Sequence, residues 1–158
     1  MTPLTESFEF TAQSLKASLE ALLPASTGHL EMGEFKSPQE VTIKITSTRA
    51  QGAPIDLTLD KDFGAYITVG KGSVFEIPFK DKRRGGNSFL EIVTTLIRAI
   101  TQNGFEEYVL LSNGVVVGAS GIIRRGGPLP TDVRESWRKL RWNPFSKRER
   151  EHHTYTPY

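Results

Sequence analysis

The sequence contains no cysteine, and this absence removes several kinds of chemistry. Disulfide bonds, thiolate nucleophiles and zinc sites built on sulfur are excluded. The stability of the folded chain must therefore come from packing. A chain of this composition is compatible with a reducing compartment.

Histidine is also scarce, with His29, His152 and His153 as the only three. Histidine supplies most general-base and metal-binding chemistry near neutral pH. His29 opens a predicted strand, where a structural or exposed position is expected. His152 and His153 are adjacent in a predicted flexible tail, where a solvated pair is favoured over a metal site. We therefore expect no metal, no cofactor and no catalytic residues.

Long apolar runs are missing as well. No stretch approaches the roughly 18 apolar residues that a transmembrane helix needs, and the first residues, Met1 to Glu6, lack a positive segment followed by an apolar one. Cytoplasmic residence without an integral membrane segment is the expectation.

The positive charge gathers at one end of the 158-residue chain. Residues 1–123 carry 11 Lys and Arg against 14 Asp and Glu, whereas residues 124–158 carry 9 against 4. The length fits a single domain. We predict a core domain at 1–123 and a basic C-terminal tail at 124–158 that docks in part on the core.

Hydrophobic periodicity predicts an α+β fold. An apolar stripe at steps of three and four predicts an N-terminal helix that Pro24 ends, and docking on the core is favoured over a partner groove. Between residues 29 and 79 the period changes to two, which predicts a meander of antiparallel strands with short turns. The stripe consists of Phe8, Ala12, Leu15, Leu19 and Leu22.

Two local signals are especially clear. Ser88 and Glu91 have the spacing of a capping box and predict a helix near residues 88–103. Asn113-Gly114 between apolar β-branched runs predicts a hairpin. With these elements the mainly antiparallel sheet has about six or seven short strands. Glu106-Glu107 is interpreted as a solvated lead-in to the first hairpin strand.

The tail is predicted to contain a short helix from Thr131 to Arg141, because Val133, Trp137 and Leu140 would share one face. The last stretch, from Phe145 to Tyr158, is polar and basic. It is predicted to be irregular unless the core or a partner holds it.

Two patterns resemble active or metal sites but lack essential residues. Gly118-Ala119-Ser120-Gly121 lacks the glycine that a nucleophile elbow needs two places after the serine, because Ile122 stands there. Asp60-Lys61-Asp62 begins like a calcium loop but has neither its third acidic position nor its bidentate glutamate. Packing and turn formation are the favoured interpretations.

A basic loop directly precedes the predicted helix at Ser88. Unpaired amides and the helix dipole at such a start favour an anion, although the loop lacks the Lys-Ser/Thr ending of a nucleotide-binding loop. A solvated surface loop and a contact to an anion or an acidic partner both remain open. The candidate residues are Lys82, Arg83, Arg84, Gly85, Gly86 and Ser88.

A second candidate site mixes basic and aromatic residues in the tail. This mixture suits phosphate contact with base stacking, an acidic protein surface or a membrane surface, while a helix packed on the core with its charges in water is the structural alternative. The candidate residues are Arg134, Trp137, Arg138, Arg141 and Trp142.

These features favour a non-catalytic protein-binding module that uses the basic loop and tail against an acidic partner. A nucleic-acid or phosphate-binding protein is the alternative, and an enzyme acting at the helix start near Ser88 is a third hypothesis. The order helix, antiparallel strands, helix, hairpin and basic tail is similar in outline to small bacterial binding modules. These include some immunity proteins, and the resemblance implies neutralisation of a toxin by covering its active site.

Overall fold

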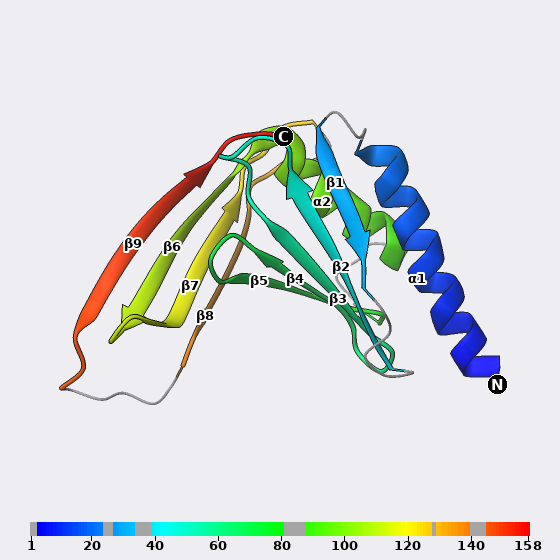
Figure 1. Ribbon diagram of the computed structural model, residues 1–158, viewed down its shortest axis with the longest axis horizontal. Coiled ribbons are helices and arrows are strands. Elements are labelled where there is room, and N and C mark those ends of the chain that lie inside the picture. Colours follow the sequence, from blue (N-terminus) through cyan, green and yellow to red (C-terminus); the bar gives the residue numbers. More distant parts are fainter. Residues whose placement is uncertain (1–2, 24–26, 34–38, 81–87, 128, 140–144) are drawn as a thin grey trace.

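The computed structural model describes residues 3–23, 27–33, 39–80, 88–127, 129–139 and 145–158. Within these residues two helices and nine strands form an α+β fold, with the strands in two mainly antiparallel sheets (Figure 1). The predicted fold class is confirmed, but the predicted number of strands was too low. In the same residues, no helix combines the length and apolar character needed to cross a bilayer.

The first sheet is a five-stranded antiparallel meander in the order β1-β2-β3-β4-β5. Its strands are β1 (Gly28–Met32), β2 (Glu40–Ser47), β3 (Ile55–Asp60), β4 (Gly64–Val69) and β5 (Ser73–Pro78). Alternate residues are buried along β2 and β3, so one face of the sheet is apolar and the other polar. This is the meander that the period of two predicted.

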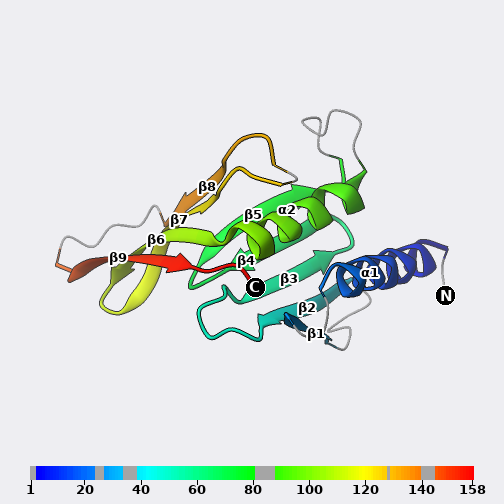
Figure 2. The ribbon, with the colours of Figure 1, turned by 90° about the horizontal axis from the view of Figure 1, so that it is seen from above.

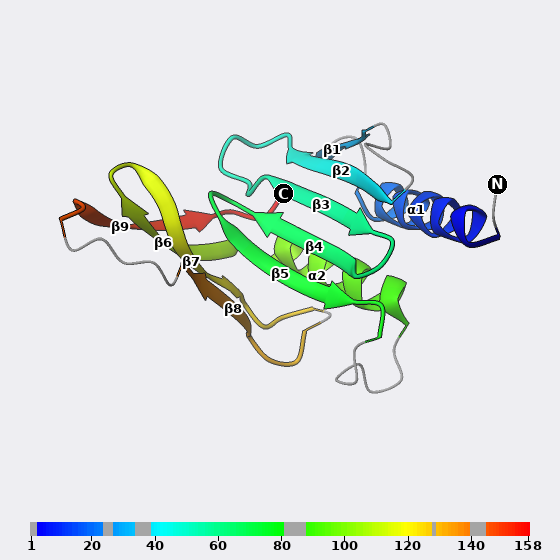
Figure 3. The ribbon, with the colours of Figure 1, turned by 90° about the horizontal axis from the view of Figure 1, so that it is seen from below.

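Both helices cover the apolar face of the first sheet, and within the described residues no helix lies over its other face (Figures 2 and 3). Helix α1 (Pro3–Leu22) buries its predicted stripe, with Phe8 only 4% exposed and Leu15 fully buried. It packs against β1 and against the second helix. The predicted docking of this helix on the core is confirmed.

Helix α2 (Phe89–Asn103) begins with the predicted capping box. The Ser88 hydroxyl accepts from the Glu91 amide, and the Glu91 carboxylate accepts from the Ser88 amide. Gly104 closes the helix at φ +76°, where its amide donates to the Ile100 carbonyl. The helix carries its apolar side chains into the core that it shares with α1 and the first sheet, which Phe105 and Ile123 of the second sheet also join.

The second sheet has the order β8-β7-β6-β9, with every neighbouring pair antiparallel. Its strands are β6 (Phe105–Ser112), β7 (Val115–Ile123), β8 (Val133–Arg138) and β9 (Arg148–Tyr155). The β6–β7 connection is the predicted hairpin, since Asn113 and Gly114 both have positive φ. The two sheets diverge from the end of the molecule where the C-terminus lies (Figure 1).

The predicted C-terminal helix is wrong, because Val133–Arg138 is strand β8. Val133 and Trp137 are four residues apart, a spacing that places two side chains on one face of a helix and equally on one face of a strand. Pairing with β7, far away in the sequence, decides between the two. Leu140 and Arg141 lie outside the described residues.

The polar stretch predicted to be irregular contains strand β9, which pairs with β6 over its whole length. The end of the chain is anchored on the core. The Tyr158 amide donates to the Thr101 carbonyl at 2.8 Å, and its hydroxyl donates to the Ala53 carbonyl at 2.5 Å. Residues 124–158 thus supply both edge strands of the second sheet.

Candidate partner-binding face

The strands of the tail separate positive from negative charge. Successive side chains of a strand point to opposite faces, so Arg148 and Arg150 lie on one face of β9 and Glu149 and Glu151 on the other. In β8 the same alternation separates two arginines from Glu135. We call the arginine-bearing side the outer face, and it carries Arg134, Arg138, Arg148 and Arg150.

The strand register extends the outer face across all four strands. One row runs from Arg138 over Gly118 and Leu110 to Arg150. The neighbouring row is Ser136, Ser120, Tyr108 and His152. Residues directly opposite one another in paired strands project to the same side, so these two rows form one surface.

These two rows contain an open cleft of about 560 Å³. Its hollow follows from small residues, because glycine and serine leave space between the larger side chains around them. Gly118 cannot be enlarged easily, since a Cβ there would lie 3.0 Å from the Trp137 carbonyl oxygen. We call this feature the cationic cleft, defined by Tyr108, Leu110, Gly118, Ser120, Ser136, Arg138 and Arg150.

Arg138 and Arg150 lie at opposite ends of one row, separated by three strand spacings or about 14 Å. Both residues are exposed. Among the residues that the structure describes, neither guanidinium group has a carboxylate within ion-pair distance. The cleft therefore presents two positive charges whose counter-charges are not supplied by the described part of the chain.

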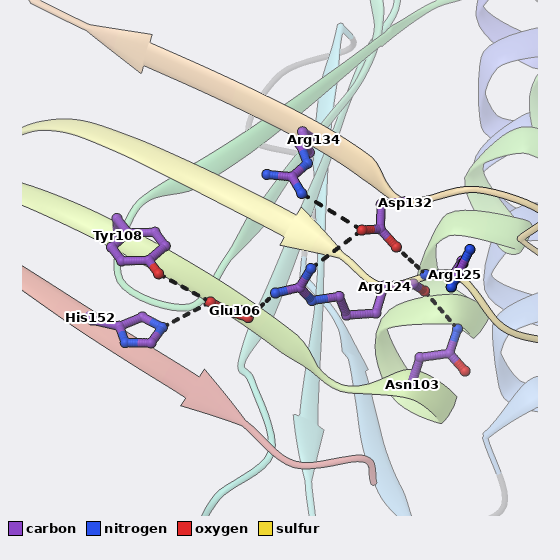
Figure 4. A network of polar contacts seen from close by, with 8 residues as sticks. All are labelled: Asn103, Glu106, Tyr108, Arg124, Arg125, Asp132, Arg134 and His152. Carbon is purple, nitrogen blue, oxygen red and sulfur yellow. Dashed lines mark hydrogen bonds and ion pairs between the residues drawn. The ribbon is translucent and has the colours of Figure 1, made fainter.

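Beside the cleft, Arg124 and His152 both contact Glu106 (Figure 4). Arg124 Nη2 donates to Glu106 Oε2 at 2.6 Å, and His152 Nε2 lies 3.0 Å from Glu106 Oε1. The hydrogen bond from Arg124 holds the pKa of Glu106 below its ordinary value, and the bond from His152 acts in the same direction. Glu106 is thus ionised at neutral pH and lowers the positive charge of this part of the face.

Asp132 continues this network toward β8 (Figure 4). Its carboxylate accepts from the Arg125 amide at 2.8 Å and from Arg124 at 3.3 Å, and Arg134 lies 3.7 Å away. The Arg125 amide is the main reason why the pKa of Asp132 is lowered. Asn103 fixes the same turn by donating to the Arg124 and Gly126 carbonyls. Arg124 and Arg134 are therefore partly neutralised, unlike the arginines of the cleft.

Tyr108 and His152 form an aromatic wall at one side of the cleft. Their rings are 4.4 Å apart and inclined by only 5°, and both contact the Glu106 carboxylate. Tyr108 remains 39% exposed. The outer face thus combines aromatic, hydroxyl and guanidinium groups.

The inner face of the second sheet attaches to the β4–β5 turn of the first. Glu107 is fully buried and accepts from the Lys71 amide at 2.6 Å, the Ser73 hydroxyl at 2.7 Å and the Tyr155 hydroxyl at 2.9 Å. Burial raises the pKa of Tyr155, and the adjacent Glu107 carboxylate raises it further. The interpretation of Glu107 as solvated was wrong, because this residue joins the two sheets.

Glu151 forms a second connection between the sheets on the same face. Its Oε2 lies 2.8 Å from Lys71 Nζ and 2.8 Å from His153 Nε2. The hydrogen bond from Lys71 is the larger cause of the lowered pKa of Glu151, and the one from His153 adds to it. On the inner face, therefore, this acid is paired with Lys71 and hydrogen-bonded to His153.

The predicted site residues do not gather at one place. Arg134 and Arg138 lie on the outer face, as described above. Trp137 points to the inner face, where its Nε1 donates to the Gly72 carbonyl at 2.7 Å, so its indole contacts the first sheet. Ser88 caps α2 at the end away from the second sheet (Figures 2 and 3). The remaining predicted site residues, Lys82, Arg83, Arg84, Gly85, Gly86, Arg141 and Trp142, lie outside the described residues.

The sequence reasoning included Arg150 in the basic tail but missed Tyr108, Ser120 and Ser136 as members of one site with it. Their proximity depends on the pairing of β6 with β7 and β9, and of β7 with β8. One signal was present in the sequence. The alternation Arg148-Glu149-Arg150-Glu151 has a period of two, which is typical of a strand with oppositely charged faces.

Comparisons with family models, with curated proteins and with solved structures give no match to this chain. In the described part of the chain, no group of three or more acidic or histidine side chains is placed to hold a metal ion. The function must therefore be inferred from the chemistry of the outer face.

Proposed function

We propose that this chain is a non-catalytic binding protein whose outer face receives an acidic surface of another protein. The observation that carries the proposal is the pair Arg138 and Arg150, which border a cleft without counter-charges from the described residues. Guanidinium groups pair with carboxylates in a forked geometry that gives both attraction and orientation. A partner that presents carboxylates at this spacing supplies the missing charges.

The charge of the outer face favours a protein over a polyanion. Glu106 and Asp132 lie on or beside the same face and neutralise part of its arginine charge. The backbone of a nucleic acid carries a negative charge at every nucleotide, so such carboxylates repel it. A protein surface with a few carboxylates matches two unpaired arginines better.

The test is affinity capture from the source cells with three forms of the chain. Wild type is compared with the double variant Arg138→Glu, Arg150→Glu and with the control Arg49→Glu, Arg98→Glu. The control changes net charge equally at exposed positions of the first sheet's loops and of α2. A protein retained by wild type and control but lost from the Arg138/Arg150 variant supports the proposal. Identical retention by all three forms contradicts it.

Toxin neutralisation, as the outline resemblance implies, is the more specific form of this proposal. It requires the captured partner to be an enzyme whose active site lies under the outer face. Inhibition of the purified partner at equimolar amounts of wild type, and its loss with Arg138→Glu, Arg150→Glu, is the expected result. A captured partner that stays fully active in the complex argues for binding without neutralisation.

Nucleic-acid binding is the second candidate, favoured by the stacked Tyr108 and His152 beside the arginines. Exposed aromatic rings on a sheet can stack bases while cations contact phosphates. Binding of a single-stranded oligonucleotide would then weaken steeply with salt, and the slope would fall by about one for each phosphate-contacting arginine removed. No binding at low salt eliminates this candidate.

A further inference from the structure

We infer that the cationic cleft binds an extended acidic segment that crosses the strands and carries two carboxylates four residues apart with an apolar residue between them. This inference rests on the proposed function and specifies its partner. Three features of the cleft support it: the spacing of the two arginines, the hollow between them and the side chains that line this hollow.

The spacing of the arginines sets the spacing of the carboxylates. Arg138 and Arg150 are separated by three strand positions, since β7 and β6 lie between their strands. Three spacings of about 4.8 Å give about 14 Å. An extended chain rises about 3.4 Å per residue, so residues i and i+4 are about 14 Å apart and point to the same side. A helical segment would need a much longer stretch, because it rises only about 1.5 Å per residue.

The residues at the floor of the cleft favour an apolar side chain at position i+2 of the bound segment. Residue i+2 of such a segment points to the same side as the two carboxylates and lies midway, above Gly118 and Leu110. Gly118 has no side chain, and Leu110 and the Tyr108 ring offer apolar surface at the same place. An aliphatic side chain at i+2 therefore fills the hollow and removes apolar surface from water.

The hydroxyl groups of the second row favour a peptide occupant. Ser120 and Ser136 are opposite one another in β7 and β8, on the same face as the arginines. Both hydroxyls can donate to and accept from the amides of an extended backbone. The Tyr108 ring, in contrast, already stacks on His152 and donates to Glu106, so it is less free to act as a base-stacking platform.

The experiment uses short labelled peptides and the full chain. The test peptide is Gly-Glu-Thr-Leu-Thr-Glu-Gly, and its control, Gly-Glu-Glu-Leu-Thr-Thr-Gly, has the same composition but a different carboxylate spacing. Fluorescence anisotropy measures affinity, and amide chemical shifts locate the contact. We expect the test peptide to bind about tenfold more tightly than the control, a difference of about 1.4 kcal/mol in binding free energy. The amide chemical shifts of Gly118, Ser120 and Ser136 should change on binding.

Variants separate this inference from the proposed function. Ser136→Leu fills the hollow at an exposed position and leaves both arginines in place, so it should weaken the test peptide about tenfold. Arg138→Glu, Arg150→Glu should abolish binding, and Arg49→Glu, Arg98→Glu should leave it unchanged. Thermal unfolding verifies that each variant is folded. If Ser136→Leu does not fold, Ser120→Thr, which adds only one methyl group to the hollow, replaces it.

The remaining outcomes overturn the inference alone or together with the proposed function. Equal binding of both peptides, or full binding by Ser136→Leu, overturns the inference, and the proposed function survives if the arginine variant still loses binding. Unchanged binding by the arginine variant overturns both. Tighter binding of a thymidine oligonucleotide of equal charge, lost in the same variants, overturns the peptide as occupant and identifies the cleft as a nucleic-acid site.

Discussion

Glu107 is the residue on which the junction between the two sheets depends. A carboxylate removed from water is stable only where donors replace its hydration, and here the replacements come from a backbone amide, a serine and a tyrosine. The three donors come from both sheets, because Lys71 lies in the β4–β5 connection and Ser73 begins β5, while Tyr155 ends β9. Removing any one of them leaves part of this charge without compensation.

Tyr155→Phe tests this junction with the smallest possible change. We expect it to lower the free energy of unfolding by about 2 kcal/mol, the usual cost of a lost hydrogen bond to a buried charge. Tyr108→Phe is the matched control, since its hydroxyl makes only a long contact of 3.3 Å to the partly exposed Glu106 carboxylate, and a change within about 0.5 kcal/mol is expected. Urea denaturation measures both. Equal effects of the two variants would show that Glu107 does not hold the sheets together.

Glu106 is expected to contribute stability that depends on pH. Its pKa is lowered in the folded state, so its contribution is present above the ordinary glutamate pKa and is lost as pH falls through the lower folded value. Glu106→Gln removes the charge at every pH. The difference in unfolding free energy between wild type and this variant should therefore shrink between about pH 6 and pH 3. A difference that stays constant over this range would contradict an ionic role.

At the scale of elements, β9 is an edge strand whose charges oppose pairing with a second copy. An antiparallel pair of identical strands that continues one sheet must place residues of the same face opposite one another. In the register centred on Arg150, this sets Arg150 against its own copy on the outer face and Glu149 against Glu151 on the other. Such like-charge pairs are destabilising and protect an open edge from self-association.

Removing these charges should make the edge self-associate. We expect the triple variant Arg148→Thr, Glu149→Thr, Arg150→Thr to dimerise more strongly than wild type, because threonine favours strands and carries no charge. Sedimentation velocity over a concentration series measures the effect. Arg148→Lys, Arg150→Lys keeps the charges and should behave as wild type. A triple variant no more associated than wild type would mean that another feature protects the edge.

The elements that could be predicted from the sequence are those with their own local signal. The α1 stripe, the Ser88 capping box and the Asn113-Gly114 turn each need only a few neighbouring residues to define a structure. The meander of the first sheet follows from short connections between strands of period two. These parts of the fold were predicted correctly for that reason.

The edge strands of the second sheet could not be predicted in the same way. Val133 and Trp137 fit a helix as well as a strand, and β9 has few apolar residues of its own. Both strands form through pairing with the β6–β7 hairpin, which is distant in sequence. The candidate site has the same origin, because Arg138 and Arg150 come to one row only when β8 and β9 take opposite edges of one sheet.

In the whole molecule, the first sheet contributes the largest part of the core and the second sheet carries the charged outer face. The first sheet and the two helices hold most of the core, and the second sheet extends away from them (Figure 1). Its charges are sorted by strand alternation, with arginines outside, of which Arg138 and Arg150 have no ion pair within the described residues, and with Glu149 and Glu151 inside, paired with Lys71, Lys147 and His153. The chain thus presents one cationic surface on a scaffold that the rest of the molecule stabilises.

Site-specific photo-crosslinking at two adjacent residues tests this account most directly. Arg148 and Glu149 are both exposed neighbours on β9 but point to opposite faces. A benzophenone amino acid replaces each in turn, and the chain is irradiated in extract of the source cells. We expect a partner protein to crosslink from position 148, and excess wild type but not the Arg138→Glu, Arg150→Glu variant to compete with it. A partner crosslinked from position 149 alone, or equally from both positions, would contradict it.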